Sequence, residues 1–257
     1  MTSHPRGPVG GLRCLVLSRQ DHGEADRIVR LLSAERGRST AIARSARRAG
    51  ARFGAALEPL SLVELGLRAR AHSMDVLEHV ELVEPHLRLR DDLDRLTQAA
   101  HAAEVCGGLA REEHPEPRLF GLCQTALLVL DAATAAPGLA FRLGLEAKAL
   151  TFAGLLAPLD RCAICGRPAQ AEDEAPWLLT AAEGAALHAA CGSSGTTCSA
   201  SFLIELEAAR RRPLQDSLDL DLPAGPRWAL AERVEAQLNR PLRARALLGD
   251  APCPVQV

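Results

Sequence analysis

The sequence contains few aromatic residues and almost no lysine. Phe, Trp and Tyr together account for 3% of the 257 residues, tyrosine is absent, and Lys148 is the single lysine. A core with so little aromatic material must be filled by leucine, alanine and valine, which suits packed helices. Proteins that hold single-stranded nucleic acid usually stack bases on aromatic rings. Only Phe53 is available for this in the first 80 residues, so any such binding there would be mainly electrostatic.

Long apolar runs are also missing. No stretch approaches the roughly 18 uninterrupted apolar residues that a transmembrane helix needs. The first residues, MTSHPRGPVGGL, contain no apolar run after a positive stretch, so we expect no secretory signal. We therefore expect a cytoplasmic protein. In a reducing compartment, clustered cysteines are metal ligands more often than disulfides.

Recognisable catalytic signatures are absent as well. The sequence has no GxxxxGK[ST] phosphate loop, no GxGxxG turn, no HExxH pair and no GxSxG elbow. We therefore expect a protein that is not an enzyme. Hydrophobic residues make up 47% of the chain and charged residues 24%, which provides a core and leaves too little charge for general disorder.

Short apolar segments separated by glycines occupy the first part of the chain. They cover residues 12–17, 28–32, 39–43, 57–65 and 74–83. Five short strands at this spacing predict a small barrel such as the OB-fold. One alternative stays open for residues 28–32, because Ile28, Leu31 and Leu32 also match a helical face.

After Pro85 the apolar pattern changes to a helical period. Leu89, Leu93, Leu96 and Ala100 would share one helical face, and a second face comprises Leu119, Leu122, Cys123, Ala126, Leu127 and Leu130. A third helix is predicted from about residue 141 to 152, a fourth with Ser201 as its N-cap, and a last one over residues 227–238. The prediction is an α+β multidomain protein: an OB-fold barrel (1–83), an all-α domain (84–159 and 199–257) and an inserted zinc knuckle (160–198).

The strongest chemical signal is a pair of matched ligand motifs in residues 160–198. Cys162 and Cys165 form a CxxC turn closed by glycine, and His188 and Cys191 repeat the same two-residue spacing. This spacing predicts one tetrahedral zinc site with three thiolates and one imidazole. Cys198 could replace His188 and give an all-thiolate site. A redox pair or two buried structural thiols are the other interpretations of the CxxC turn.

Four further cysteines have no partner at ligand spacing. Cys14, Cys106, Cys123 and Cys253 are most simply packing residues. A complete set of protein ligands leaves no open metal position for water, so we expect the zinc site to be structural rather than catalytic.

Arginine is concentrated near the start of the chain. The first 80 residues hold 13 arginines and 8 acidic residues, a net charge of +5, whereas the remainder holds 17 basic and 24 acidic residues, a net of −7. No acidic residue interrupts the segment from residue 36 to 52, which on a strand and loop would neutralise several phosphates. A solvated loop is the alternative. Its arginines are Arg36, Arg38, Arg44, Arg47, Arg48 and Arg52. Arg240, Arg243 and Arg245 form either a second patch or a solvated tail.

Four segments resemble the bacterial RecO family of recombination mediators. EADRIVRLLSAERGR at residues 24–38 and ARSARRAGARFGAALEPLSLVEL at residues 43–65 are similar to the family's N-terminal region. LDRCAICGRP at residues 159–168 and NRPLRARALL at residues 239–248 are similar to its zinc region and C-terminus. The four segments occur in the family's order, so the resemblance spans nearly the whole chain.

The resemblance implies an N-terminal OB-fold and a helical domain interrupted by a zinc knuckle. It also implies a DNA repair protein that binds single- and double-stranded DNA and anneals complementary strands. Such a protein would work with RecR and the C-terminal tail of the single-strand-binding protein SSB to load RecA. Carried onto this sequence, the family's basic OB positions are Arg19, Arg38, Arg44, Arg47, Arg48 and Arg52.

Two positions depart from the family pattern. The usual Ala-Arg-Gly turn reads Ala43-Arg44-Ser45 here, so Ser45 replaces a glycine. His188 stands where relatives with an all-cysteine site have their third ligand, and imidazole is a common substitute for thiolate on zinc.

Two other functions are consistent with the sequence. One is a zinc-stabilised adaptor that binds proteins and contacts DNA only incidentally. The other is a zinc-dependent hydrolase, which would require an open metal position that the proposed ligand sets do not leave. We favour the non-enzymatic mediator because of the four matching segments and the polarised charge. Residues 142–152 are the place to search for a pocket that receives the SSB tail.

Overall fold

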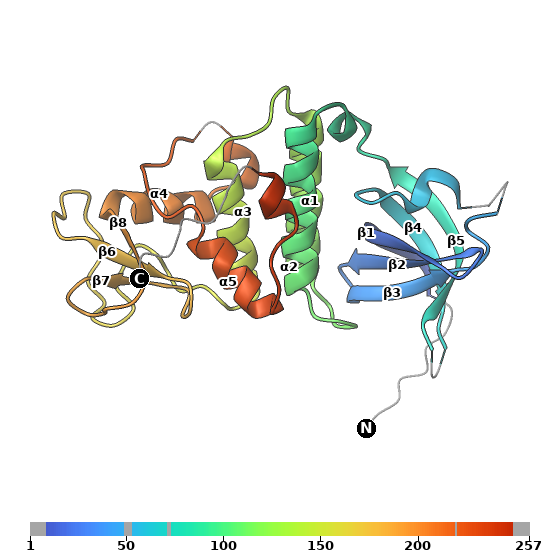
Figure 1. The fold of residues 1–257 in the computed structure, drawn as a ribbon, viewed down its shortest axis with the longest axis horizontal. Helices are drawn as coiled ribbons and strands as arrows, with labels where there is room; N and C mark the ends of the chain where they lie inside the picture. Colours follow the sequence, from blue (N-terminus) through green and yellow to red (C-terminus); the bar gives the residue numbers. More distant parts are fainter. Residues whose placement is uncertain (1–8, 49–52, 71–72, 219, 249–257) are drawn as a thin grey trace.

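The computed structural model describes residues 9–48, 53–70, 73–218 and 220–248. Figure 1 shows three parts in a row, with a β-barrel at one end, helices in the middle and a small sheet at the other end. The barrel and the helical region agree with the fold predicted from the sequence.

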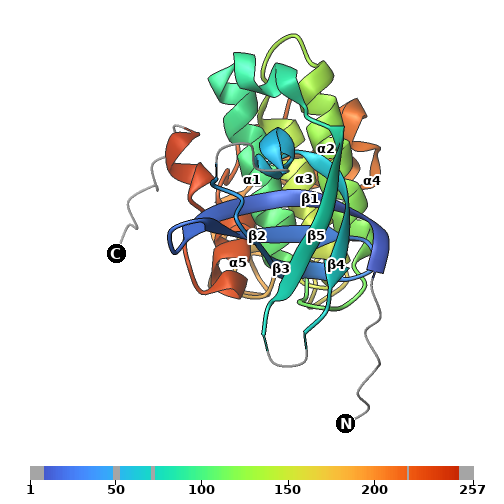
Figure 2. The same cartoon turned by 90° about the vertical axis from the view of Figure 1, so that its right-hand side faces the viewer.

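Five strands form a closed barrel. They are β1 (Val9–His22), β2 (Asp26–Ser33), β3 (Gly37–Ala43), β4 (Leu62–Arg68) and β5 (Asp75–Glu84). The strand order is β1-β2-β3-β5-β4, and β1 closes the barrel by pairing with both β2 and β4. The β3–β5 pair is parallel and the other pairs are antiparallel. Figure 2 shows β4 and β5 crossing in front of the first three strands.

The structure decides between strand and helix for residues 28–32 and corrects the bounds of one predicted strand. Residues 28–32 belong to a strand, because Val29 and Leu31 are fully buried in the barrel while Arg30 between them is exposed. The helical alternative for this segment is therefore wrong. The predicted strand at residues 57–65 is wrong in its first half. Gly54–Leu57 form a short 3-10 helix, η1, and Leu60 has a φ of +72°, so the chain turns before β4 begins.

Five helices follow the barrel in the described part of the chain. They are α1 (Leu93–Leu109), α2 (Pro117–Ala132), α3 (Leu139–Phe152), α4 (Ala200–Arg211) and α5 (Ala229–Leu238), with short 3-10 turns η2 (Leu87–Asp91), η3 (Leu214–Ser217) and η4 (Ala244–Leu247). The predicted apolar face of α2 is confirmed, since all six of its residues are buried. None of these helices has the length and apolar character needed to cross a lipid bilayer.

The buried face of α1 differs from the predicted one. Leu93 is 74% exposed, and Ala100 is exposed, whereas Ala99, Ala102 and Cys106 are fully buried. Small side chains allow α1 to approach its neighbours closely, so alanine rather than leucine marks its core face. The predicted N-cap of α4 is also wrong by two residues. Ser199, not Ser201, caps the helix by accepting a hydrogen bond from the Phe202 amide at 3.1 Å.

The barrel is attached to the helices by backbone contacts as well as by side chains. The Arg38 amide donates to the Arg111 carbonyl at 3.0 Å, and the Glu113 amide donates to the Arg38 carbonyl at 3.0 Å. Arg36 adds ion pairs to Asp75 of the barrel at 2.7 Å and to Glu113 of the α1–α2 loop. Arg36 therefore joins the two parts of the protein and is not free to contact a phosphate.

A small sheet occupies the segment between α3 and α4. Its strands are β6 (Trp177–Thr180), β7 (Ala185–His188) and β8 (Thr196–Cys198), in the order β7-β6-β8. Trp177 in the central strand is fully buried and joins the core of the helical domain. The sheet places the two halves of the cysteine-rich segment next to each other.

Candidate nucleic-acid interface and metal centre

Three of the four predicted metal ligands lie together. The Sγ atoms of Cys162, Cys165 and Cys191 are all within 4.8 Å of one another. The CxxC turn is closed by a hydrogen bond from the Gly166 amide to the Cys162 carbonyl at 3.0 Å, and Gly166 has a φ of +73° that favours glycine. Three thiols at this separation could hold a metal ion.

The electrostatics of the cluster favour a thiolate at Cys162. Burial alone raises its pKa, but hydrogen bonds from the amides of Cys165, His188 and Ile164 and from the Cys165 thiol together lower the pKa to about 6. The pKa of Cys191 is raised to about 11, first by its hydrogen bond with Cys165, then by burial, and further by a hydrogen bond with Cys162 and by repulsion from charge on the neighbouring sulfurs. A divalent cation among the sulfurs would remove this repulsion.

The sheet order separates the two candidates for the fourth ligand. Trp177 on the central strand is paired with His188 on one side and with Cys198 on the other. The backbones of His188 and Cys198 are therefore two strand spacings apart, about 9 to 10 Å. The His188 backbone belongs to the cluster: its amide donates to Cys162 Sγ at 3.4 Å, and its carbonyl accepts from the Cys191 amide at 2.8 Å.

Neither candidate side chain is part of the three-sulfur group. The His188 ring lies 5.5 Å from the Trp177 ring, and its Nε2 is 3.5 Å from the Arg167 guanidinium. Cys198 is buried on β8, and burial raises its pKa to about 12. A rotation of the His188 side chain would be needed to complete a tetrahedral site, whereas Cys198 would have to cross the central strand.

The predicted DNA-contacting arginines fall into two groups. Arg44 and Arg48 are exposed in the turn after β3 and form no ion pair with a described residue. The other described arginines of this set form ion pairs within the chain. Arg19 pairs with Glu58 at 2.5 Å, Arg38 lies 3.9 Å from Glu112, and Arg47 pairs with Asp21 at 3.2 Å; Arg52 lies outside the described residues.

The turn that carries these arginines keeps a left-handed backbone despite its serine. Ser45 has a φ of +56°, and its amide donates to Asp26 Oδ1 at 2.8 Å. Arg47 also donates to the Gly23 carbonyl at 3.1 Å. The turn is therefore held against the β1–β2 hairpin, and Arg44 and Arg48 project from a fixed support.

The C-terminal arginines are mostly engaged within the chain. Arg240 pairs with Glu104 at 2.5 Å, and Arg245 pairs with Glu235 at 2.5 Å while it stacks on Trp228 with 4.3 Å to the ring centroid. These contacts anchor the end of the chain to α1 and α5. They leave only Arg243 of the three without an ion pair to a described residue.

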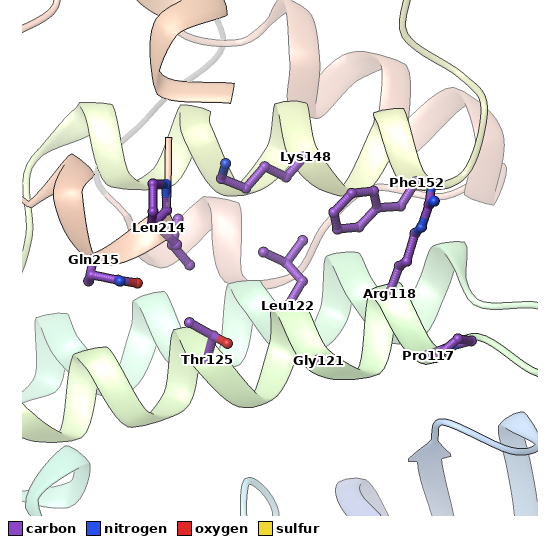
Figure 3. A pocket seen from close by; sticks show the side chains of 10 residues that line it. Pro117, Arg118, Gly121, Leu122, Thr125, Lys148, Phe152, Leu214 and Gln215 are labelled. Carbon is purple, nitrogen blue, oxygen red and sulfur yellow. The ribbon is translucent and has the colours of Figure 1, made fainter. Parts of the chain in front are cut away.

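A pocket of about 380 Å³ lies between α2, α3 and η3. Arg118 of α2 reaches towards Phe152 of α3, with 5.7 Å from its guanidinium carbon to the ring centroid (Figure 3). Leu122 of α2 lies to one side of this pair and points towards α3, and Lys148 donates to the carbonyls of Arg210 and Arg212. The pocket combines apolar surface with a cation. The residues predicted for this pocket from the sequence, 142–152, cover only its α3 side.

Other functional candidates were not predicted from the sequence. Arg13 and Arg30 are exposed on β1 and β2 and form no ion pair with a described residue. The outward position of Arg30 follows from the alternation of residues 28–32 once the strand is chosen over the helical alternative.

The fold and site define a broad class of protein. A closed five-stranded barrel of this order is OB-like, and here it is joined to a helical domain with a cluster of three cysteines. Two family models match the chain, described as recombination protein O N terminal over residues 12–86 and recombination protein O C terminal over residues 90–220.

Similar proteins agree with these matches. The DNA repair protein RecO of Anaeromyxobacter dehalogenans (strain 2CP-C) is 40% identical over 252 residues, which cover 92% of this chain and 94% of the relative. The DNA repair protein RecO of Myxococcus xanthus (strain DK1622) is 38% identical over 178 residues, covering 69% and 70%. The chain belongs to the RecO family of DNA repair and recombination proteins.

Proposed function

We propose that this chain is a recombination mediator that binds single- and double-stranded DNA and anneals complementary strands. With RecR, it would help to load RecA onto DNA coated by SSB. The observation that carries the proposal is a pair of exposed arginines, Arg44 and Arg48, that form no ion pair with a described residue and lie on a turn hydrogen-bonded to the β1–β2 hairpin of an OB-like barrel. Membership of the RecO family supports it. Such a protein would work in the cytoplasm, at the nucleoid.

Annealing by such a protein needs charge and shape rather than catalytic groups. Two DNA strands repel each other through their phosphates, and guanidinium groups that replace condensed counterions lower this repulsion. Because contacts to phosphates leave the base edges free, complementary strands can still pair. Annealing of this kind requires no active site, in line with the absence of catalytic motifs from the sequence.

The Arg44→Ala/Arg48→Ala variant tests the proposal. We expect weaker binding to both single- and double-stranded oligonucleotides and slower annealing. If each arginine neutralises one phosphate, the slope of log K against log salt should fall in magnitude by about 1.4 for single strands and about 1.8 for duplex. Fluorescence anisotropy over a salt series measures both values.

A charge-matched control separates a local contact from a general loss of positive charge. Arg88 and Arg212 are exposed and form no ion pair with a described residue, so Arg88→Ala/Arg212→Ala removes the same charge elsewhere. The control should bind DNA like the wild type. If both double variants lose the same affinity, or if neither does, the assigned interface is wrong.

We further propose that the cysteine cluster holds one structural Zn²⁺ through Cys162, Cys165, Cys191 and His188. The three neighbouring sulfurs and the position of the His188 backbone support this set. Zinc would fix the CxxC turn to the end of β7 and would supply no chemistry to DNA. Our proposed division of the chain stays an OB-fold (1–83), a zinc-knuckle insertion (160–198) and a helical domain (84–159 and 199–257).

The pocket between α2 and α3 favours a role in binding a protein partner. A peptide that ends in the pocket would place its α-carboxylate against Arg118 and an apolar side chain against Phe152 and Leu122. We propose that the SSB C-terminal tail is this peptide. A zinc-stabilised adaptor would use the same pocket, but DNA binding by such an adaptor would not depend on Arg44 and Arg48.

Arg118→Ala is expected to weaken binding of a peptide with the C-terminal sequence of SSB by about tenfold, because a charge-assisted hydrogen bond to a carboxylate is lost. Amidation of the peptide's C-terminus should weaken binding to the wild type similarly. It should have little further effect on the variant. Titration calorimetry with Arg88→Ala as control measures this, and independent, additive losses would contradict the assigned contact.

A further inference from the structure

A group of buried charges lies at the end of α4. At its centre is Glu207, whose side chain is only 4% exposed. Its Oε2 accepts hydrogen bonds from Arg210 Nε at 2.7 Å and from the Leu159 amide at 3.2 Å. Its Oε1 accepts from Arg211 Nε at 2.6 Å, and Arg211 also pairs with Asp160 at 2.9 Å. Because a buried carboxylate is stable only with its partners in place, the end of α4 is held against residues 159 and 160.

Asp160 begins the hairpin that carries the first two cysteines of the metal centre. We call residues 160–169 the CxxC hairpin. At its base the Ala169 amide donates to the Asp160 carbonyl at 2.9 Å. Nearer the CxxC turn, the Cys162 amide donates to the Arg167 carbonyl at 2.8 Å. A shift of the CxxC turn would therefore reach the end of α4 through the backbone of the hairpin and the ion pair of Asp160.

The same helix end is held from the other side by Lys148 of α3, the only lysine in the chain. Its side chain is buried, and its ammonium group donates to the Arg210 carbonyl at 2.6 Å and to the Arg212 carbonyl. The last carbonyls of a helix have no partner within the helix, so a cation is well placed there. Arg212 is followed directly by residues 213–215, which line the pocket between α2, α3 and η3 (Figure 3). We call these three residues the η3 wall.

We propose that the CxxC hairpin supports the η3 wall, and that a metal ion bound by the cysteine cluster raises the affinity of the pocket for a peptide that ends in it. The inference rests on the proposed function and deepens it, because it names what regulates the pocket. Glu207 and Lys148 are positioning residues in this arrangement. They hold the end of α4 between the CxxC hairpin on one side and the η3 wall on the other.

The physical link is the freedom of the CxxC hairpin. A bound ion would join sulfurs of the CxxC turn to Cys191, so the hairpin would lose freedom. In the metal-free protein the hairpin and the end of α4 would share a larger freedom, and the η3 wall would take its peptide-binding position for only part of the time. The apparent dissociation constant rises by the inverse of that fraction, so a fraction of about one fifth weakens binding about fivefold. Coupling is reciprocal, so the peptide would strengthen metal binding by the same factor.

Removal of the metal is the first test. We expect a peptide with the C-terminal sequence of SSB to bind about fivefold more weakly to chelator-treated protein than to protein with one zinc ion per chain, as measured by titration calorimetry. A saturating concentration of the peptide should in turn raise the zinc affinity about fivefold, as measured against a competing chelator. Inactive protein in the chelated sample would lower the measured stoichiometry but would not produce this reciprocal gain.

The Arg211→Ala variant weakens the link between the CxxC hairpin and α4. The Arg211 side chain is 59% exposed, and each of its two acidic partners keeps another arginine, so no buried charge is left unpaired. The effect of zinc on peptide affinity should fall from about fivefold to about twofold in this variant. Arg212→Ala is the matched control, because Arg212 is the exposed neighbour and forms no ion pair with a described residue. It should keep the full effect of zinc.

Hydrogen exchange tests the η3 wall without a peptide. Removal of zinc should speed the amide exchange of residues 214–217 in the wild type and in Arg212→Ala, whereas residues 119–130 of α2 should exchange as before. Unchanged exchange of residues 214–217, or an equal effect of zinc in Arg211→Ala and the wild type, would overturn the inference. A peptide that does not bind the zinc-loaded protein, although exchange responds to zinc, would contradict only the proposed occupant of the pocket. A wild type that takes up no zinc would contradict both the zinc proposal and this inference.

Discussion

An alanine at Gly37 is expected to destabilise the protein by about 3 kcal/mol, because two penalties add there. Gly37 has a φ of +58°, a conformation that costs a residue with a Cβ about 1 to 2 kcal/mol. An added Cβ would also lie 2.4 Å from the carbonyl oxygens of both Arg111 and His114. Backbone atoms cannot rotate away, so the α1–α2 loop would have to leave the barrel.

Gly23 supplies the matched control for this prediction. Its φ is +57°, almost the same, but an added Cβ would meet nothing within 4 Å. Gly23→Ala should therefore cost only the backbone penalty, about 1 kcal/mol. Urea unfolding of the two variants and the wild type measures the difference. Equal losses in stability would show that the close approach of barrel and loop contributes nothing.

The contact at Gly37 matters for function because it fixes the orientation of the barrel. The same loop binds β3 through the Arg38 backbone and engages Arg36 with Glu113. These hydrogen bonds and this ion pair connect the barrel, with its exposed arginines, to the helical domain that contains the pocket. Under the proposed function, they would set the separation between a DNA strand on the barrel and a peptide in the pocket.

The parts of the fold that the sequence predicted are those determined by local periodicity. Buried and half-buried residues alternate strictly along β3, and the apolar stripe of α2 follows a period of about 3.6 residues; both segments form the expected elements. The buried face of α1 was predicted wrongly because the helix packs through alanine and cysteine. These residues give a weaker hydrophobic signal than leucine, and Leu93 is exposed.

The sequence could not show which arginines form ion pairs within the protein, because their acidic partners are distant in sequence. Arg19 meets Glu58, Arg38 meets Glu112, and Arg36 meets Glu113 only after the barrel closes and the helices dock. A count of charges in one segment contains no information about these pairs. The three cysteines, in contrast, were found from spacing alone, since ligands in two tight turns need only one contact between the turns.

Replacing Cys162 with serine is expected to abolish stoichiometric zinc binding, since Cys162 is the most buried sulfur of the cluster and its thiolate accepts the His188 amide. Structural zinc contributes its binding free energy to folding. A loss of about 3 kcal/mol would lower the melting temperature by roughly 10 °C in a domain of this size. Chelator treatment of the wild type should give a similar shift, and it should leave the melting of Cys162→Ser unchanged.

The choice of the fourth ligand predicts opposite results for two further variants. Zinc content should stay at one ion per chain in Cys198→Ser, because β6 separates Cys198 from the other sulfurs. His188→Ala should bind zinc more weakly, and in the Co²⁺-substituted protein the ligand-field bands should shift while thiolate charge-transfer bands for three sulfurs persist. If Cys198→Ser loses the metal and His188→Ala keeps it, the site is all-thiolate, and β8 must move past Trp177 to form it.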